Sequence, residues 1–332
     1  MPRNIVFAID VEPNARKLGL SDSWDGTAVT LREVSALRNR LQEATGAPVR
    51  LNWFPRFDPQ IQRMWGRRDW VVEACPTLLP TAIGNGDFIG IHVHLWRWHE
   101  NRGVWFADFA NDAWCADCFG ASIEGYRSVF GAGPIASRFG DRSLFHRDIA
   151  LLRRSGIRYD LTLEPGAPSH RLSIDALASC HLPDYRRAPR RPYRPSCGDY
   201  LVPREPTSAA EPADDLWLVP MTVTRRSYWV PLKQPPFLIK STLPLNLVVR
   251  PRRAWAHLSV EMDRESPAPI VCVLRSGDLA NPGLLANFHF ITRRMVRHPL
   301  ISHCRFVSVD CAVKAFSGSQ NKSGFLDASS RR

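Results

Sequence analysis

The chain has 332 residues, of which 44% are hydrophobic and 23% are charged, and its formal net charge at pH 7 is +12. This length and composition exclude a small disulfide scaffold and a chain that is disordered throughout, and they allow one large α/β barrel or two domains. The positive charge favours anionic partners such as nucleic acid, phosphorylated or uronic-acid carbohydrate, or an anionic membrane surface, and it says nothing about the fold.

The first 54 residues alternate between strand and helix patterns. Residues 4–10 form a short apolar run that ends in Asp10, which is typical of a buried parallel strand. Residues 30–46 have apolar side chains at helical spacing and end at Gly46, and residues 47–54 predict a second strand. A strand, a helix and a strand in this order predict a parallel sheet with crossover helices.

The same alternation continues to the end of the chain. Because no break in composition separates two halves, six or seven strands with helices between them favour a single parallel barrel over 1–312. Residues 160–215 are rich in Pro and Arg and predict a long excursion over one rim, and the polar residues 313–332 predict a disordered tail. The other expected strands are 88–96, 135–140, 157–163, 216–223 and 269–279, and the other expected helices are 72–86, 115–131, 141–156 and 286–298.

Cysteine usage and the apolar runs bear on the compartment. The eight cysteines are scattered, so most are expected to be reduced, and Cys115 and Cys118 are expected near one helical face rather than in a zinc or redox site. The apolar run 5–9 is too short for a secretory signal, and no stretch approaches the ~18 apolar residues of a membrane span. We therefore expect a cytoplasmic protein without a transmembrane segment.

Polar residues that follow the predicted strands are the candidate site. Asp10 and Glu12 lie at the end of the first strand, His92 and His94 lie in the carboxyl half of the third, and Arg138 lies near the end of the segment 135–140. The carboxyl ends of parallel barrel strands meet on one face, where such barrels carry their chemistry. Residues two apart on a strand share a face, so both histidines can reach one ion or substrate, although the spacing alone does not prove a site.

Several segments together resemble the polysaccharide deacetylase family, the NodB-homology or carbohydrate esterase family 4 group, over about residues 4–312. "FAIDVEP" resembles the acidic first motif, and "GDFIGIHVH" resembles the second motif, which leads into a metal-ligand histidine. "SRFGDRSLFHRDIALLRRSGIRYDLTLEPG" is similar to the third motif and is the most specific match. "RPYRPSCGDYL" and "LWLVPMTVT" resemble the substrate loop and following strand of the subgroup associated with surface polysaccharide and lipopolysaccharide synthesis.

The resemblance implies a distorted (β/α)7 barrel that removes an acetyl group from an N-acetylated sugar with the help of a divalent metal ion, with zinc as the expected ion. It implies that Asp10 is the general base and that Arg138 orients it. It also implies that Glu12 and His92 are metal ligands. Trp96 occupies the place of the usual second histidine ligand, so His94 would replace that ligand or act as acid or base.

Other residues near these motifs have two interpretations each. Trp96 and Trp98 would stack on sugar faces or pack on the barrel rim. Arg275 stands near the position where the family has an acid histidine, and it would bind an anionic substrate group or pair with Asp278. Asp141 is interpreted as a helix cap.

The substrate expected from the resemblance is a carbohydrate, and an anionic, nucleotide-linked or lipid-linked form stays open. The alternatives are a metal-independent hydrolase of the same fold that uses Asp10 and the histidines directly, and a carbohydrate-binding pseudoenzyme. Specific nucleic-acid binding is not expected, because the positive charge is unaccompanied by any recognisable binding module. The sequence leaves the oligomeric state open.

Overall fold

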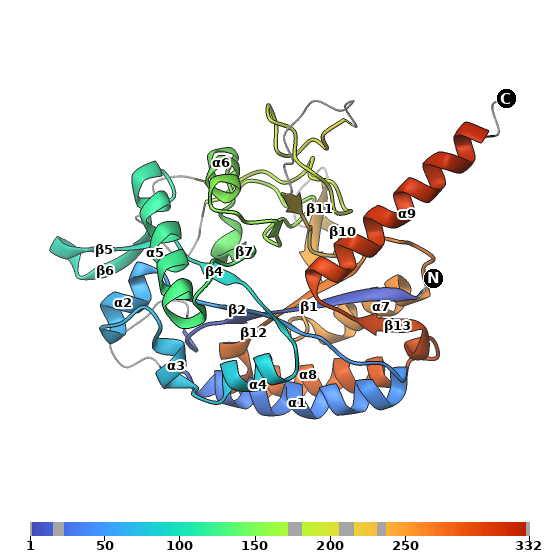
Figure 1. Cartoon of the computed structure of the whole chain (residues 1–332), viewed down its shortest axis with the longest axis horizontal. Coiled ribbons are helices and arrows are strands. Elements are labelled where there is room, and N and C mark those ends of the chain that lie inside the picture. The colour runs from blue at the N-terminus through green and yellow to red at the C-terminus, as the bar shows by residue number, and fades with distance from the viewer. Residues whose placement is uncertain (1, 16–22, 172–180, 206–215, 231–236, 330–332) are drawn as a thin grey trace.

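The computed structural model describes residues 2–15, 23–171, 181–205, 216–230 and 237–329. Its helices lie around two parallel sheets (Figure 1). The strands are β1 (Arg3–Val11), β2 (Asn52–Pro55), β3 (Phe88–Ile89), β4 (Ile91–Val93), β5 (Trp96–His99), β6 (Val104–Ala107), β7 (Ala136–Phe139), β8 (Tyr159–Asp160), β9 (Trp217–Leu218), β10 (Val223–Val230), β11 (Phe237–Pro244), β12 (Ile270–Arg275) and β13 (Cys304–Phe306).

The α-helices follow most of the strands, as the alternation in the sequence predicts. Helices α1 and α8 contact each other, and both lie along the outer side of the sheet that contains β1 (Figure 1). The helices are α1 (Asp25–Thr45), α2 (Pro59–Trp65), α3 (Trp70–Ala74), α4 (Leu78–Gly84), α5 (Asp112–Phe130), α6 (His146–Arg154), α7 (Pro251–Asp263), α8 (Pro282–Val296) and α9 (Val309–Ser329). The 3-10 turns among the described residues are η1 (Glu100–Arg102), η2 (Gly140–Arg142), η3 (Ser276–Ala280) and η4 (Ile301–His303).

The parallel strands form one sheet in the order β12-β1-β2-β3, in which β13 also pairs with β1, and a second sheet in the order β4-β7-β8-β9. A parallel bridge between Arg56 and His92 joins the two sheets along one seam. At the opposite edges of the two sheets, the segment after β9 approaches β12, and the Thr222 amide donates to the Val271 carbonyl at 3.0 Å. This contact forms a second seam. The fold is therefore mixed α/β with parallel sheets, and the described strands do not form one closed ladder.

Strand β1 shows how the core is divided. Its side chains alternate between two apolar clusters, because successive residues on a strand point to opposite faces. Ile5, Phe7 and Ile9 pack with the helices, whereas Val6 and Ala8 belong to a cluster that both sheets share. The even-numbered positions of β1 thus contribute to the interior between the two sheets, together with side chains from the other parallel strands.

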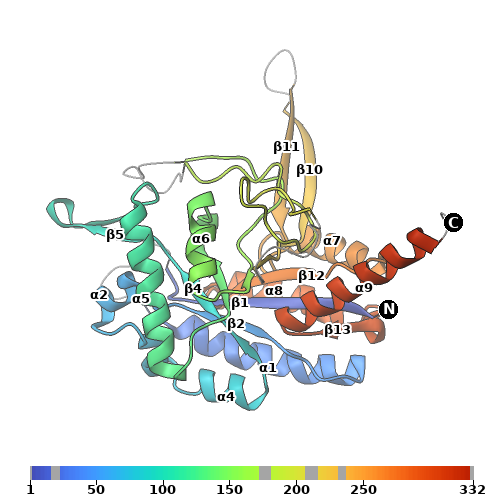
Figure 2. The same cartoon turned by 45° about the horizontal axis from the view of Figure 1, so that its top comes forward.

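Several segments differ from the sequence prediction. The predicted helix 72–86 is two short helices, α3 and α4, and the predicted strand 88–96 is interrupted at Gly90. A Cβ at Gly90 would lie 2.7 Å from the Phe54 ring of β2 and 2.8 Å from the Ala136 carbonyl oxygen of β7. The chain between β3 and β4 therefore lies too close to β2 and β7 for any residue other than glycine at position 90. The antiparallel hairpin β10–β11, which rises away from the sheets in Figure 2, is not predicted by the sequence analysis.

The C-terminal segment also differs from the prediction. Helix α9 continues to Ser329, where the sequence predicts a disordered tail over 313–332. The side chains of Val313 and Phe316 are buried against the body of the protein, and this packing holds the first half of the helix in place. The polar average composition of 313–332 conceals these two buried anchors.

The remaining predictions about organisation concern loops, cysteines and membranes. Residues 161–171 and 181–205 form loops with isolated bridges, and 172–180 and 206–215 of the predicted excursion lie outside the described residues. Cys115 and Cys118 are buried in α5 as free thiols. Within the described ranges, no helix combines the length and the apolar character needed to cross a membrane.

Candidate active site

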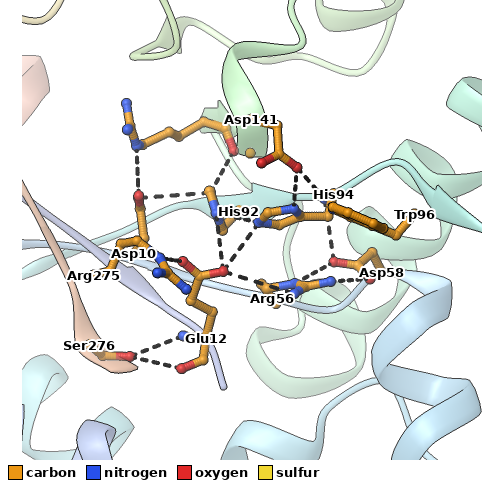
Figure 3. A network of polar contacts seen from close by, with 12 residues as sticks. Asp10, Glu12, Arg56, Asp58, His92, His94, Trp96, Asp141, Arg275 and Ser276 are labelled. Atoms are coloured by element: carbon orange, nitrogen blue, oxygen red, sulfur yellow. Dashed lines mark hydrogen bonds and ion pairs between the residues drawn. The ribbon is translucent and has the colours of Figure 1, made fainter. Parts of the chain in front are cut away.

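The candidate site lies where the interior-facing positions of several strands turn from apolar to polar. Val6 and Ala8 of β1 face the interior, and Asp10 and Glu12 continue the same face. In β4 the flanking Ile91 and Val93 pack toward the helices, so His92 faces inward. The same alternation directs His94, Arg138 of β7 and Arg275 of β12 inward. The residues that the sequence analysis selected at strand ends are therefore brought together in one cluster (Figure 3).

Asp10 and Arg138 form a buried ion pair. The Arg138 Nε donates to both carboxylate oxygens of Asp10, at 2.8 and 3.0 Å. Arg138 also donates from NH1 to the Leu161 carbonyl at 2.6 Å, which fixes the guanidinium in its place. A charge-assisted contact of this kind orients the carboxylate firmly toward the pocket.

Glu12, His92 and His94 place three ligand atoms around one point. The two histidine Nε2 atoms are 3.0 Å apart, and Glu12 Oε2 lies 3.2 Å from His94 Nε2 and 4.0 Å from His92 Nε2. Around a tetrahedral zinc ion with bonds of about 2.0–2.1 Å, neighbouring ligand atoms lie about 3.3 Å apart. All three residues are buried and their ligand atoms lie within 4.8 Å of one another, so the spacing suits a metal ion.

The hydrogen bonds that the two histidines make through Nδ1 also support a metal site. His92 Nδ1 lies 2.9 Å from the Arg138 carbonyl oxygen, which only accepts, so Nδ1 carries the proton. His94 Nδ1 lies 3.2 Å from the Asp141 carboxylate, which gives the same assignment. Both Nε2 atoms then present lone pairs toward each other and toward Glu12, and three acceptors at this distance require a cation between them. Metal-ligating histidines have the same arrangement of outer partners.

The electrostatics of the cluster agree with an anionic Glu12 and a neutral His92. Burial alone would raise the pKa of Glu12, but Arg275 and the two histidines hold it well below its usual range. Burial lowers the pKa of His92 to about 4, against the opposing effect of Asp10. Burial and Arg56 would lower the pKa of His94, yet its hydrogen bonds to Asp141 and Glu12 raise it above its ordinary value. The cation that the three acceptors require is thus a proton on His94 or a metal ion in its place.

Arg275 is engaged within the site. Its Nε contacts the Glu12 carboxylate, and its NH1 lies 3.1 Å from Asp278. Of the two interpretations of Arg275, the pairing with Asp278 is present, and the contact with Glu12 adds a link that the sequence did not indicate. The adjacent Ser276 hydroxyl exchanges hydrogen bonds with the backbone of Glu12, accepting at 3.0 Å and donating at 3.1 Å. Strand β12 therefore holds the side chain of Glu12, and the adjoining turn η3 holds its backbone.

Asp141 is not the helix cap that the sequence predicts. It lies in the turn η2 with φ 53°, and helix α6 starts five residues later at His146. Its Oδ2 accepts from Trp96 Nε1 at 2.9 Å and from His94 Nδ1 at 3.2 Å. The left-handed backbone conformation turns the carboxylate inward, and Asp is one of the few residue types that adopt it readily.

The two tryptophans lie away from the pocket lining. Trp96 is 1% exposed and reaches the site through its hydrogen bond to Asp141. Trp98 lies on the β5–β6 hairpin, edge-on to Trp105 at 5.3 Å between ring centroids, with the Arg63 guanidinium 5.2 Å from its ring. Neither indole lines the pocket around Asp10, so packing on the rim describes Trp96 better than stacking on a sugar.

Arg56 and Asp58 belong to the site but are missed by the sequence analysis. Arg56 pairs with Asp58 at 2.8 Å and lies 3.9 Å from Glu12. Asp58 Oδ2 in turn accepts from the His94 amide at 3.4 Å. Both residues follow the strand at 47–54, so applying the rule of polar residues at strand ends to this strand would have found them.

Gly140 allows the close approach of η2 to His94. A Cβ at this position would lie 2.3 Å from two atoms of the His94 ring, which is too close for any side chain. The turn can therefore pass directly over the imidazole only because residue 140 has no side chain.

A pocket of 440 Å³ opens over this cluster. At its inner end it is lined by Asp10, Glu12, His92 and Arg138, and at its other end by residues of the β10–β11 hairpin and α7. Its volume lies within the range of about 300–1,000 Å³ that is usual for small-molecule sites. The site thus combines the oriented carboxylate of Asp10, three acceptor atoms that suit a bound cation, and space for a small substrate.

Comparison with known proteins gives matches in structure only. No protein-family model matches the chain, and no curated protein matches it. A crystal structure of Puue allantoinase aligns with 95% of this chain and 90% of its own, at 11% identity and a TM-score of 0.50. A probable polysaccharide deacetylase from Pseudomonas aeruginosa PAO1 aligns with 94% of this chain and 90% of its own, at 11% identity and a TM-score of 0.50.

The chain shares its fold with these two structures. A 4-alpha-glucanotransferase from Thermococcus litoralis has the same TM-score of 0.50 at 12% identity, and the match covers 95% of this chain but 40% of that one. The resemblance to polysaccharide deacetylases is thus borne out at the level of the fold over nearly the whole chain. The activity must be argued from the site itself, because one fold supports many activities.

Proposed function

We propose that this protein hydrolyses the carbon–nitrogen bond of an N-acetylated sugar and releases acetate. The observation that carries the proposal is the juxtaposition of the Asp10–Arg138 pair with the ligand atoms of Glu12, His92 and His94 at the inner end of one pocket. The fold shared with a probable polysaccharide deacetylase and with an allantoinase supports it.

In this proposal Asp10 is the general base. It takes a proton from a water molecule as the water oxygen bonds to the acetyl carbonyl carbon, while Arg138 keeps the carboxylate in position. When the carbon–nitrogen bond breaks, the proton passes from Asp10 to the leaving nitrogen, so that acetate and a free amine result. Arg275 has no part in this proton transfer, because a guanidinium does not give up its proton at neutral pH.

Glu12, His92 and His94 would hold a divalent metal ion, with zinc as the expected ion. Such an ion, when bound, lowers the pKa of water and polarises the acetyl carbonyl. Asp141 and the Arg138 carbonyl would keep the two imidazoles in the tautomer that faces the ion. Arg275 and Ser276 would hold Glu12 in place.

The proposal extends to architecture and setting. The seams at Arg56–His92 and Thr222–Val271 support a distorted (β/α)7 barrel. A cytoplasmic location and a role in surface polysaccharide synthesis, both expected from the sequence, remain parts of this proposal.

The test is acetate release from a panel of N-acetylated monosaccharides, nucleotide sugars and oligosaccharides. Wild-type protein should release acetate, and Asp10→Asn should reduce the rate at least about 100-fold, which is the lower range for losing a general base. Asp117→Asn, at an exposed position of α5, is the matched control and should keep full activity. A protein that binds these sugars but releases no acetate would be a carbohydrate-binding protein, and the proposal would be wrong.

Metal content separates the proposed mechanism from its metal-independent alternative. Elemental analysis of wild type should find about one divalent ion per chain, and Glu12→Gln should lose it. Acetate release by a wild-type protein that contains no metal would assign the reaction to Asp10 and the histidines alone.

A further inference from the structure

The outer end of the pocket is lined by cationic and polar side chains that the proposed reaction does not use. Arg250 immediately precedes α7, Arg253 lies in its first turn, His257 lies in its middle, and Thr242 comes from β11. These residues line the same 440 Å³ cavity as Asp10 and Glu12, so both groups face the ligand that the cavity holds.

The charges of the pocket do not balance. Each of the four acids that line it has a basic partner: Asp10 pairs with Arg138, Glu12 with Arg275, Asp141 with His94, and Glu164 with Arg142. Arg250 and Arg253 line the same pocket, and no acidic side chain among the described residues pairs with either. Two guanidinium charges are thus left facing the cavity, where an anion would neutralise them.

Two uncharged atoms in the same wall also lack partners. The buried Nε2 of His257 and Oγ1 of Thr242 have no hydrogen-bond partner among the described residues. Buried polar atoms are nearly always paired in folded proteins, so two orphans on one pocket wall indicate polar groups of a ligand.

Backbone strain gathers around the pocket as well. The non-glycine residues with positive φ in the described ranges are Asp141, Arg142 and Arg250, at 53°, 59° and 52°. All three line this pocket. Such conformations cost energy and cluster at ligand sites, where surrounding structure holds them in place.

We propose that the substrate is a phosphorylated N-acetyl sugar, whose phosphate binds Arg250 and Arg253 while its acetamide lies over Asp10. This inference rests on the proposed function and adds the class of substrate. Two unpaired guanidinium groups match the charge of a phosphate monoester, about −1.5 to −2 at neutral pH, better than the single charge of a carboxylate. His257 and Thr242 then have sugar hydroxyls as partners.

The test measures binding separately from hydrolysis. The full chain with Asp10→Asn is titrated calorimetrically with N-acetylglucosamine 1-phosphate, UDP-N-acetylglucosamine, N-acetylglucosamine and N-acetylneuraminic acid, and wild type is titrated with inorganic phosphate. The sugar phosphate should bind at least about tenfold more tightly than the neutral sugar, and more weakly as salt is added. Arg250→Ala and Arg253→Ala should each weaken its binding about tenfold or more and leave neutral-sugar binding unchanged.

Arg252→Ala is the matched control, because Arg252 is exposed on the same turn and does not line the pocket. It should bind the sugar phosphate as the parent protein does. Comparison of the sugar phosphate with the UDP sugar distinguishes a free phosphate end from a nucleotide-linked one, since either supplies the phosphate.

The two proposals fail in different ways. Tight binding of N-acetylneuraminic acid that requires Arg250 and Arg253 and exceeds that of the sugar phosphate would overturn the assignment of phosphate. Equal affinity for the phosphorylated and neutral sugars in parent and arginine variants would overturn the anion site, whatever the hydrolytic activity. Arginine-dependent phosphate binding without any acetate release from wild type would overturn the proposed function and leave the anion site standing.

Discussion

Replacing Asp141 by Asn tests whether the three inner acceptors form a metal site. Asn tolerates the left-handed backbone at residue 141, so η2 should keep its shape. The change removes the negative charge that holds the proton on His94 Nδ1 and leaves a single oxygen acceptor for two donors, His94 and Trp96. Loss of such an outer partner typically lowers metal affinity about 10–100-fold.

The size of the effect follows from linkage. At a zinc concentration of 100 times the dissociation constant, binding should stabilise the wild type by about 2.7 kcal/mol. An unfolding entropy of about 2.1 cal/mol/K per residue converts this, for 332 residues, into a rise in Tm of about 4 °C. With 10–100-fold weaker affinity at the same zinc concentration, Asp141→Asn should gain about 1.4 to 0.4 kcal/mol, or about 2 °C and less.

The assay is thermal unfolding of metal-stripped protein with and without zinc, followed by circular dichroism. Glu12→Gln should abolish the shift, and the exposed control Asp117→Asn should keep it. An Asp141→Asn protein whose Tm rises as much as that of wild type would refute the orienting role of Asp141. A wild type that shows no shift would refute the metal site itself.

Three further predictions concern the same region. Gly140→Ala should weaken zinc binding in the same assay at least about tenfold, because the added Cβ would displace the His94 ring. Gly120 faces open space on α5, so the control Gly120→Ala should be neutral or stabilise the helix by about 1 kcal/mol. A double-mutant cycle of Asp10→Asn and Arg138→Gln, measured by urea denaturation, should give a coupling of about 1–3 kcal/mol, and additive effects would contradict the buried pair. Burial raises the pKa of Asp160 to about 6, so its contribution to folding stability should be complete below about pH 4 and be lost as the pH rises through 6. Between pH 4 and 7, the free energy of urea unfolding should fall by about 3 kcal/mol less in Asp160→Asn than in wild type. The remaining fall is due to Asp148, whose pKa is also raised to about 6. An unchanged slope in the variant would contradict the assignment to Asp160.

The sequence by itself determined the order of most strands and helices and the inner part of the site. Apolar runs and helical spacing are local signals, and the period of two along a strand fixes which side chains share a face. For this reason the sequence alone places Asp10, Glu12, His92 and His94 together. The strand-end rule also selected Arg138, and the resemblance to deacetylases, which is borne out in the fold, gave it the role of orienting Asp10.

Only the tertiary structure decided which groups complete the site. Asp141 has the sequence pattern of a helix cap because it precedes an amphipathic helix, whereas its left-handed backbone and the close approach of Gly140 to His94 are features of the tertiary structure. Arg56, Arg250 and Arg253 are ordinary charged residues in the sequence, and they gain their significance from long-range neighbours. Side chains in turns and at helix starts are directed by contacts between segments far apart in the chain, and no local period encodes those contacts.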